Sequence, residues 1–240
     1  MAGNAKYKRV LLKLSGESLC EAGQMGIQAS AVDRAVDELV PAMDLGVQVG
    51  IVVGGGNLIR ARDLAGDPNI LRTTADHMGM LGTVMNALAL ADAISGRGRK
   101  AVAMSAIPMP TVCEPFSRRQ AIRHLDDGQV VIFAGGTGNP FFTTDTAAAL
   151  RASETGAELL VKATKVDGIY DADPAANPGA RKYETLTYAE AMRQNLAIMD
   201  QAAFALCSEN RITLAVCRLL DPGNLVKILT GEHVGTTIKP

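Results

Sequence analysis

The sequence predicts an α/β protein, a three-layer αβα sandwich with a mostly parallel central sheet. Three observations support this prediction. Six short apolar runs, rich in β-branched residues or leucine, recur along the chain. Each run is nearly continuous in its apolar character and does not alternate, as is typical of strands covered on both faces. Most of the gaps between the runs are long enough for a crossover helix.

The six apolar runs define the expected strands of the sheet. They span residues 9–14, 47–53, 101–105, 129–134, 158–164 and 212–219. The tail, residues 235–238, is expected to add a final edge strand. Before it, Asp221 and Pro222 have the residue types of an N-cap and a first helical position, so they are expected to open the last helix.

Helical periodicity fills the two longest gaps near the start. After Ser30, apolar residues follow a three-to-four spacing, and Asp33 completes a capping-box pattern. Pro41 predicts a kink in that helix. Residues 73–95, rich in Met, Ala and Leu, predict a long buried helix that ends at Gly96.

Composition limits the kind of protein. The 240 residues are 48% hydrophobic, so a sizeable core is expected. No repeat or linker divides them, and we expect one domain over residues 1–240 with a subdomain division near Asp145. Twenty-four Lys and Arg against 25 Asp and Glu give a net charge of −1, which argues against a nucleic-acid-binding surface.

Targeting and cross-linking signals point to the cytoplasm. No apolar run approaches the roughly 20 residues of a membrane span, and the first nine residues lack the apolar stretch of a signal peptide. We therefore expect a cytoplasmic protein without a membrane partner. Cysteine and histidine residues are scattered without a C-x-x-C, which argues against a disulfide scaffold and a structural zinc site. They are Cys20, Cys113, Cys207, Cys217, His77, His124 and His233.

Three glycine clusters, residues 13–17, 54–57 and 135–140, follow expected strands. Open α/β sheets bind ligands at the carboxyl ends of their strands. Glycine lets backbone N–H groups turn toward a phosphate, and a helix that begins just downstream adds the positive end of its dipole. Any one cluster is equally well explained as a tight turn, but three together favour a phosphate-binding site.

The common nucleotide-binding signatures are absent or out of context. No Gly-Lys dipeptide occurs, so the chain has no Walker A loop and is not a P-loop kinase. Residues 96–101 spell a dinucleotide fingerprint, but they follow an expected helix and precede an expected strand, which is the reverse of the required context.

Five charged residues are candidates for a phosphoryl-transfer site, where Lys and Arg neutralise phosphate charge. Lys13 ends a buried strand beside a Ser-Gly turn, where an unpaired ammonium is costly; the alternative is an exposed strand end. Arg60 follows the second glycine cluster and either reaches back to phosphates or is solvated. Asp76, Asp145 and Asp200 open expected helices, as caps or as functional carboxylates.

Several segments resemble the bacterial UMP kinases of the amino acid kinase superfamily, nearly from end to end. The GGGN of residues 54–57 alone indicates only the superfamily, which includes carbamate, aspartate and acetylglutamate kinases, whereas residues 137–144 are particular to UMP. The resemblance implies the amino acid kinase fold. The matching segments are LKLSGE (12–17), GGGN (54–57), DHMGM (76–80), TGNPFFTTD (137–145) and KATKVDG (162–168).

The resemblance also implies the site residues. It assigns catalysis to Lys13, Asp145 and Asp200, and divides the chain into a UMP-binding half, about 1–145, and an ATP-binding half, about 146–240. The implied ATP contacts are Lys13, Leu14, Ser15, Gly16, Gly56, Arg60, Thr164, Tyr170 and Asp173. The implied UMP contacts are Gly55, Asp76, Thr137, Gly138, Asn139, Pro140, Phe141, Phe142, Thr143 and Thr144.

The implied reaction transfers the ATP γ-phosphoryl group to UMP, giving UDP and ADP in pyrimidine nucleotide (CTP and UTP) biosynthesis. Mg²⁺ would arrive with ATP, with no metal ligand set from the protein. The family further implies a homohexamer, inhibition by UTP and, in many members, activation by GTP. Residues 95–100 and the positions around Arg118 and Gln129 lack the side chains of the enteric GTP site, which leaves the GTP response undecided.

Two other classes of function remain at this stage. An acyl-phosphate-forming kinase for carbamate or an amino acid would share the fold and the ATP half-site. A non-enzymatic sensor of uridine nucleotides would use the same loops, although Lys13 and Asp145 argue against it. A dehydrogenase is a more distant alternative. No Ser-His-Asp or Cys-His set is evident, in agreement with direct transfer to an acceptor that is already an oxyanion.

Overall fold

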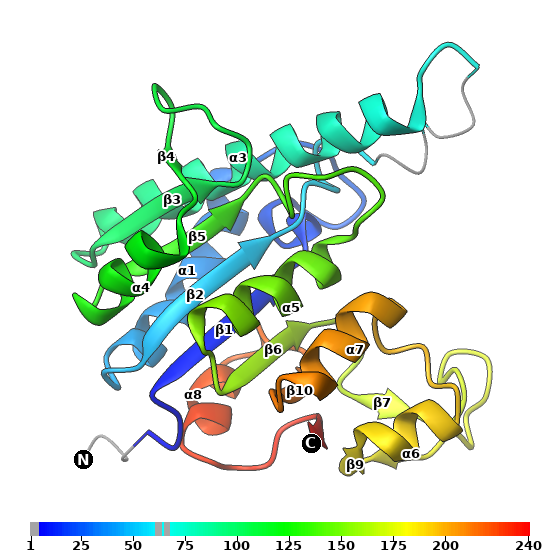
Figure 1. Ribbon diagram of the computed structural model, residues 1–240. Coiled ribbons are helices and arrows are strands. Elements are labelled where there is room, and N and C mark those ends of the chain that lie inside the picture. Colours follow the sequence, from blue (N-terminus) through cyan, green and yellow to red (C-terminus); the bar gives the residue numbers. More distant parts are fainter. Residues whose placement is uncertain (1–4, 61–63, 65–67) are drawn as a thin grey trace.

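A computed structural model describes residues 5–60, 64 and 68–240 of the chain. Figure 1 shows strands enclosed by helices on both sides. The strands are β1 (Arg9–Leu14), β2 (Gln48–Val53), β3 (Ala101–Ser105), β4 (Glu114–Pro115), β5 (Val130–Ala134), β6 (Leu159–Ala163), β7 (Ile169–Tyr170), β8 (Lys182–Tyr183), β9 (Thr185–Thr187), β10 (Thr213–Cys217) and β11 (Thr236–Lys239). The helices are η1 (Gly16–Leu19), α1 (Ala29–Met43), α3 (Arg72–Gly96), α4 (Arg118–Asp126), α5 (Thr144–Thr155), α6 (Tyr188–Arg193), α7 (Gln201–Glu209) and α8 (Asn224–Leu229).

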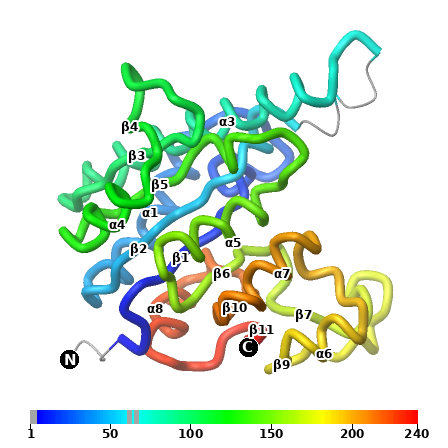
Figure 2. Tube along the Cα trace, in the orientation of Figure 1, coloured from blue at the N-terminus to red at the C-terminus, as the bar shows by residue number. Residues whose placement is uncertain are grey.

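The described residues form one nine-stranded sheet, in the order β4-β3-β5-β2-β1-β6-β10-β11-β9, and a two-stranded ribbon of β7 and β8. Every pair in the large sheet is parallel except β10 with β11. Figure 2 shows how this order brings distant segments together, since β1 lies between β2 and β6. Because neighbouring parallel strands end at one edge, the loops after β1, β2, β5 and β6 meet there.

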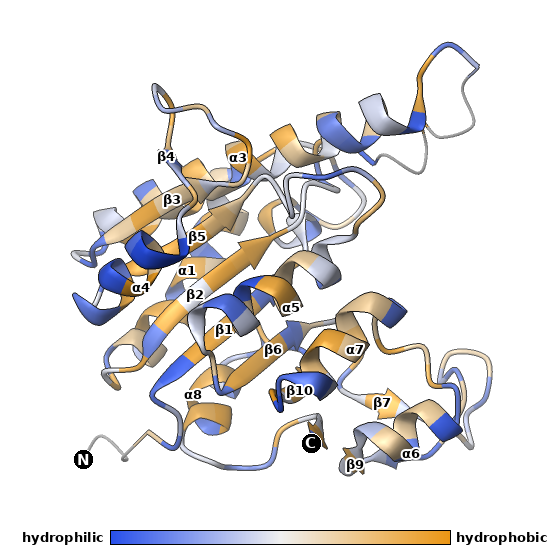
Figure 3. Cartoon of the chain, in the orientation of Figure 1, coloured by the Kyte–Doolittle hydropathy of each residue, from blue (hydrophilic) through white to orange (hydrophobic). Residues whose placement is uncertain are grey.

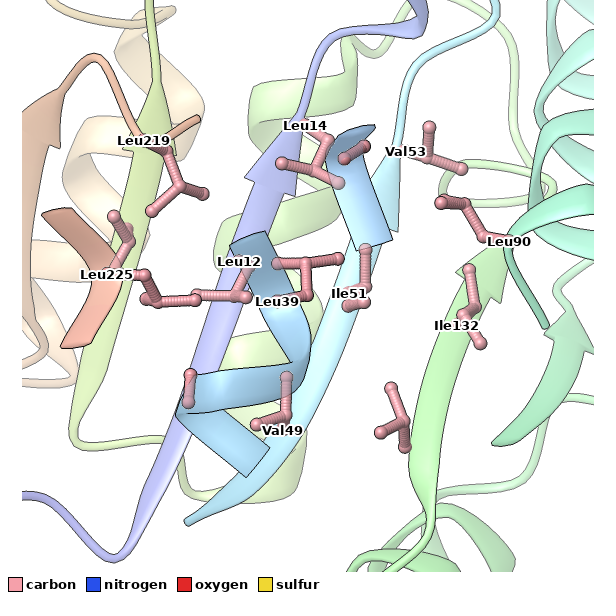
Figure 4. Close-up of a cluster of buried hydrophobic side chains, with 14 of the residues drawn as sticks. Leu12, Leu14, Leu39, Val49, Ile51, Val53, Leu90, Ile132, Leu219 and Leu225 are labelled. Atoms are coloured by element: carbon pink, nitrogen blue, oxygen red, sulfur yellow. The ribbon is translucent and has the colours of Figure 1, made fainter. Parts of the chain in front are cut away.

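Two apolar layers enclose the sheet, which confirms the predicted three-layer αβα fold. Side chains alternate along β1, so that Leu12 belongs to the core cluster that includes residues of α1, α3 and α8, whereas Leu11 belongs to the cluster on the opposite face, which includes residues of α4, α5, α6 and α7. Figure 3 shows the strands as largely apolar along their length. Figure 4 shows the first layer, where Leu39 of α1 lies beside Ile51 of β2 and Leu90 of α3 lies near Val53.

The predicted strands all form, and two, β1 and β3, have the predicted bounds. The expected tail strand is β11, which pairs antiparallel with β10. Periodicity had not indicated β4, β7, β8 and β9, which are two or three residues long. Runs this short are too brief to show a period.

The predicted starts of two helices are wrong. Helix α1 begins at Ala29 with Gln28 as an N-cap that makes no side-chain hydrogen bond, and the Ser30 hydroxyl donates to Glu21 Oε1 at 3.1 Å. That tertiary contact competes with the capping box. The helix runs through Pro41 and ends at Met43; a kink there stays a prediction.

Helix α8 begins after Gly223, and Asp221 with Pro222 lies in the turn before it. Gly223 takes a left-handed φ of 76°, and its N–H donates to Glu38 Oε2 at 3.0 Å. A carboxylate of α1 thus binds the N-terminal region of α8. Because glycine adopts this φ without strain, the cap moves to the position where the contact with α1 is made.

The expectation that no apolar segment reaches the length of a membrane span does not hold for α3. Its 25 residues contain an 18-residue window with a mean hydropathy of 1.3, so by length and composition alone it is long and apolar enough to cross a membrane. Half of that window, 50%, is buried inside the protein, where Leu90 and Ile94 join the core. Core helices of globular proteins pass the same test.

A stability prediction follows from the backbone before β11. Gly235 has a φ of 70°, and an added Cβ would overlap the Val216 carbonyl oxygen. We expect Gly235→Ala to lower the free energy of unfolding by about 1–3 kcal/mol. Gly96→Ala is the control, because its Cβ would meet nothing within 4 Å, and we expect it to be neutral or slightly stabilising. Urea denaturation of both variants measures the difference; equal stabilities would contradict the prediction.

Candidate active site

Two buried lysines face one carboxylate at the carboxyl edge of the sheet. Lys13 of β1 and Lys162 of β6 occupy paired positions on neighbouring parallel strands. Asp145 Oδ1 lies 3.0 Å from Lys13 Nζ, and Asp145 Oδ2 lies 2.5 Å from Lys162 Nζ. The three side chains are only 13–15% exposed. Lys162 Nζ also donates to the Ile198 carbonyl oxygen, so its position is fixed by two acceptors.

Two helix starts carry the carboxylates of this cluster. Thr143 is the N-cap of α5, and its hydroxyl oxygen accepts hydrogen bonds from the backbone N–H groups of Asp145 and Thr146. Asp200 is the N-cap of α7 and accepts from the Ala203 N–H at 2.9 Å. The hydroxyls of Thr143 and Thr146 both donate to Asp200 Oδ2. The two helices therefore begin side by side, beside the lysines.

Burial and pairing set the charges of the cluster. Burial lowers the pKa of Lys162, and the attraction of Asp145 opposes this effect without cancelling it. Burial alone would raise the pKa of Asp200, but hydrogen bonds from Thr143 and Ala203 outweigh it and hold that pKa below its usual value. Asp200 is therefore a carboxylate at neutral pH.

A first cavity of about 450 Å³ opens beside this cluster, between the second and third glycine loops. An added Cβ on Gly55 would come 2.5 Å from the Gly79 carbonyl oxygen, so the loop packs directly on α3. Asp76 Oδ2 accepts from the Phe141 N–H at 2.9 Å and Asp76 Oδ1 pairs with Arg72 at 3.0 Å. The lining is Glu17, Gly55, Gly56, Ile59, Arg60, Arg72, Asp76, Gly79, Met80, Thr83, Gly136, Thr137, Asn139, Phe142, Thr143 and Thr144.

A second cavity of about 560 Å³ lies on the other side of the first loop. It contains Lys13 and combines residues that follow β1, β6 and β10. The two cavities share one lining residue, Glu17. The lining is Lys13, Ser15, Glu17, Ser18, Ala163, Thr164, Lys165, Arg218, Leu219, Leu220 and Asp221.

A buried pair of amides fastens the second glycine loop to α3. Asn57 Nδ2 donates to Asn86 Oδ1 at 3.0 Å, and Asn86 Nδ2 donates to the Gly54 carbonyl oxygen at 2.7 Å. Both side chains are buried. An added Cβ on Gly16 would come 2.6 Å from the Gly54 carbonyl oxygen, so only glycine fits where the loops touch. This contact holds the second loop, which lines the first cavity, against the first loop, which lines the second.

The predicted catalytic residues meet, and the predicted ATP contacts divide. Lys13, Ser15 and Thr164 line the second cavity, whereas Gly56 and Arg60 line the first. Leu14 and Gly16 are buried in the strand end and loop. Within the described part of the chain, Tyr170 and Asp173 line neither cavity. The Tyr170 hydroxyl donates to Asp167, whose pKa lies at about 2 because of its hydrogen bonds from Lys182 and Tyr170.

The predicted UMP contacts fall mostly on the first cavity. Seven of them line it: Gly55, Asp76, Thr137, Asn139, Phe142, Thr143 and Thr144. Gly138, Pro140 and Phe141 belong to the same loop but do not line the cavity. The Phe141 ring is 66% exposed and lies under the Arg72 guanidinium.

Sequence reasoning gave no role to Lys162, Glu17 or Asn86. Lys162 stands at the end of a predicted strand, as Lys13 does, and that shared position was a usable signal. Glu17 lies within the matching segment 12–17, and nothing in that local pattern indicates its role. Asn86 sits inside an apolar helix pattern, where a buried amide has no local signature.

Comparisons with known proteins agree with this geometry. The model described as Amino acid kinase family matches residues 8–218. A uridylate kinase of Legionella pneumophila (strain Lens) is 53% identical over 97% of this chain and 94% of its own length. A uridylate kinase of Xanthomonas oryzae pv. oryzae (strain KACC10331 / KXO85) is 51% identical over 97% of both chains.

Solved structures show the same relationship. The structure of UMP kinase from Bacillus anthracis has a TM-score of 0.94 at 39% identity, and covers 97% of this chain and 96% of that chain. The fold and the lysine–aspartate cluster thus define a phosphotransferase of the parallel-sheet α/β class, and the chain belongs to the amino acid kinase family. Within that family it groups with the bacterial UMP kinases, also named uridylate kinases.

A prediction follows from the shared carboxylate. Asp145→Asn leaves two buried ammonium groups without their counter-ion, so we expect the free energy of unfolding at pH 7 to fall by about 3 kcal/mol. Removing Asp145 also lowers the pKa of Lys162 further, since Asp145 raises it now. The unfolded chain then binds more protons than the folded chain, so the loss shrinks as the pH rises toward 10.

Urea denaturation between pH 7 and pH 10 measures this loss. Asp33→Asn is the control, because Asp33 is 56% exposed and its ion pair with Arg97 lies on the surface. We expect less than about 1 kcal/mol for the control. A pH-independent loss in Asp145→Asn would contradict the electrostatic origin.

Proposed function

We propose that this chain transfers the γ-phosphoryl group of ATP to the phosphate of UMP, giving UDP and ADP. The observation that carries the proposal is the cluster of Lys13, Lys162 and Asp145: Lys13 lines the second cavity, and Thr143 and Thr144, which directly precede Asp145, line the first. The curated relatives named uridylate kinase support UMP as the acceptor. The role of this chain would be in the biosynthesis of UTP and CTP.

The first cavity is proposed as the UMP site and the second as the ATP site. The first is lined only by residues up to Thr144, among them the hydroxyls and amides of the Thr137 loop. The second cavity is lined by Lys13 and its neighbours in the first loop. The rest of its lining lies at the ends of β6 and β10, in the C-terminal half. This arrangement supports halves that meet near Asp145. Gly56 and Arg60 would then act on the acceptor side of the boundary.

The chemistry needs placement of charge and no general base. The UMP phosphate is already an oxyanion at neutral pH, so it attacks without losing a proton to the protein. Lys13 would stabilise charge on the γ-phosphoryl oxygens in the transition state, with Lys162 beside it. Asp145 would orient both ammonium groups. Asp200 accepts hydrogen bonds from Thr143 and Thr146 and so would hold the start of α7 against the start of α5. No covalent enzyme intermediate is required.

A divalent metal fits this site as a companion of ATP, and we propose Mg²⁺. In the described part of the chain, no three His, Cys, Asp or Glu side chains converge to hold a metal by themselves. Asp145 Oδ1 forms an ion pair with Lys13 but has no aligned hydrogen-bond donor, so it is the oxygen of this cluster that could accept a hydrogen bond from a metal-bound water. When bound with ATP, Mg²⁺ neutralises part of the phosphate charge.

The wider proposal follows the family. We propose a cytoplasmic homohexamer that is inhibited by UTP, with GTP as a candidate activator. We propose neither a nucleic-acid nor a membrane partner, since the net charge is −1 and half of the apolar window of α3 is buried.

An acceptor panel tests the proposed reaction. With ATP and Mg²⁺, we expect ADP release with UMP and none with carbamate or an amino acid, since the Thr137 loop lines the acceptor cavity. A coupled ADP assay with UMP, CMP, dUMP and carbamate measures this, repeated with UTP and GTP added. Turnover of carbamate with UMP inert would assign the chain to the acyl-phosphate-forming kinases. Tight UTP binding without turnover of any acceptor would favour a sensor.

A second prediction concerns Lys13. Lys13→Ala removes a cation that acts mainly in the transition state, so we expect kcat to fall by at least about 100-fold with a smaller change in the KM for ATP. Lys227→Ala, an exposed lysine of α8, is the matched control and should keep normal turnover. Near-normal turnover of Lys13→Ala would remove Lys13 from the catalytic role.

A further inference from the structure

Glu17 lies where the two cavities meet. It belongs to η1, the short helix that begins within the first glycine cluster, and it lines both cavities. Its two carboxylate oxygens are divided between two cations. Oε1 lies 2.6 Å from Nη2 of Arg60, which lines the first cavity, and Oε2 lies 2.7 Å from Nζ of Lys165, which lines the second.

We propose that Glu17 is a positioning residue shared by the two nucleotide sites. Its carboxylate holds Arg60 at the wall of the acceptor cavity and Lys165 at the wall of the donor cavity before either nucleotide binds. This inference rests on the proposed function, because it assigns one phosphate-bearing ligand to each cavity. Glu17 itself does not contact the transferred group and is not a catalytic residue.

Conformational entropy gives the physical reason. Lys and Arg side chains have many rotamers, and ordering them on binding lowers affinity. Arg60 is held at two points, since its Nε also donates to the Gly56 carbonyl oxygen at 3.3 Å. Lys165 is 87% exposed, so an ion pair is its main restraint among the contacts that the structure shows. A carboxylate placed between them lowers the ordering cost on both sides of the boundary.

The charge balance allows this role. One carboxylate with two cations leaves a net positive charge, so a phosphate still meets an attractive potential on either side. The Lys165 side chain is 87% exposed and the Arg60 side chain 36%, and ion pairs of such accessible cations add little to folding stability. The arrangement therefore acts more on where the cations lie than on whether the chain folds.

Direct binding of each nucleotide tests the proposal without turnover. Isothermal titration calorimetry with UMP alone, and with ATP and Mg²⁺ alone, gives the two Kd values. We expect Glu17→Gln to weaken both by about threefold to tenfold. Lys165→Met should weaken ATP only, and Arg60→Met should weaken UMP only, because each cation lines one cavity.

A double-mutant cycle separates positioning from a structural effect. In the Lys165→Met background, Glu17→Gln should no longer change the Kd for ATP but should still weaken UMP, since Arg60 remains. A merely structural role would weaken both nucleotides in either background. Wild-type-like Kd values in Glu17→Gln, or additive losses for ATP in the cycle, would overturn the proposal.

Two controls keep the result interpretable. Asp33→Asn removes a carboxylate from a surface ion pair on α1 and should leave both Kd values unchanged. If Glu17→Gln does not unfold cooperatively, Arg60→Met and Lys165→Met carry the test, and equal losses for both nucleotides in each would overturn it. Failure of the wild-type chain to bind UMP or ATP would instead reject the proposed function.

Discussion

The pairing of Lys13 with Lys162 across two neighbouring strands is the constraint on which the rest of the site depends. Parallel pairing of β1 with β6 puts both residues at matching positions. Two ammonium groups so close together repel each other and lose hydration, so they need a carboxylate between them. Asp145 supplies it because Thr143 caps α5 at that point. Sheet register and helix capping together thus create a local cation site in a chain of net charge −1.

Close packing of neighbouring backbone against the glycine loops shapes them as much as any ligand does. Gly16 and Gly55 have backbone or side-chain atoms where a Cβ would stand. The buried amides of Asn57 and Asn86 then fix the loop edges, since leaving such groups without partners is costly. Two cavities result with a thin wall between them, and Glu17 stands in that wall. Close cavities are what direct transfer between two phosphates requires.

Carboxylates pair with the cations of the site both in the buried cluster and nearer the surface. The buried lysines share Asp145, whereas the more exposed Arg60 and Lys165 share Glu17. At the deeper site burial lowers the pKa of Lys162 and the pairing with Asp145 opposes that effect, while the shallower pairings mainly restrict side-chain motion. The same chemistry therefore tunes charge near the transferred group and orientation near the cavity mouths.

The sequence alone determined the six strands of the apolar runs and the tail strand, the layer order and the edge at which the loops gather, because apolar runs and glycine turns are local signals of burial and chain reversal. Lys13, Asp145 and Asp200 were also found from their positions at element ends. Only the tertiary structure decided that Lys162 faces Asp145, that Arg60 lines the first cavity and that Gly223 replaces Asp221 as the cap of α8. Each of these depends on contacts between segments far apart in the chain, such as Gly223 with Glu38, and no local pattern of residues records the register or packing that brings them together.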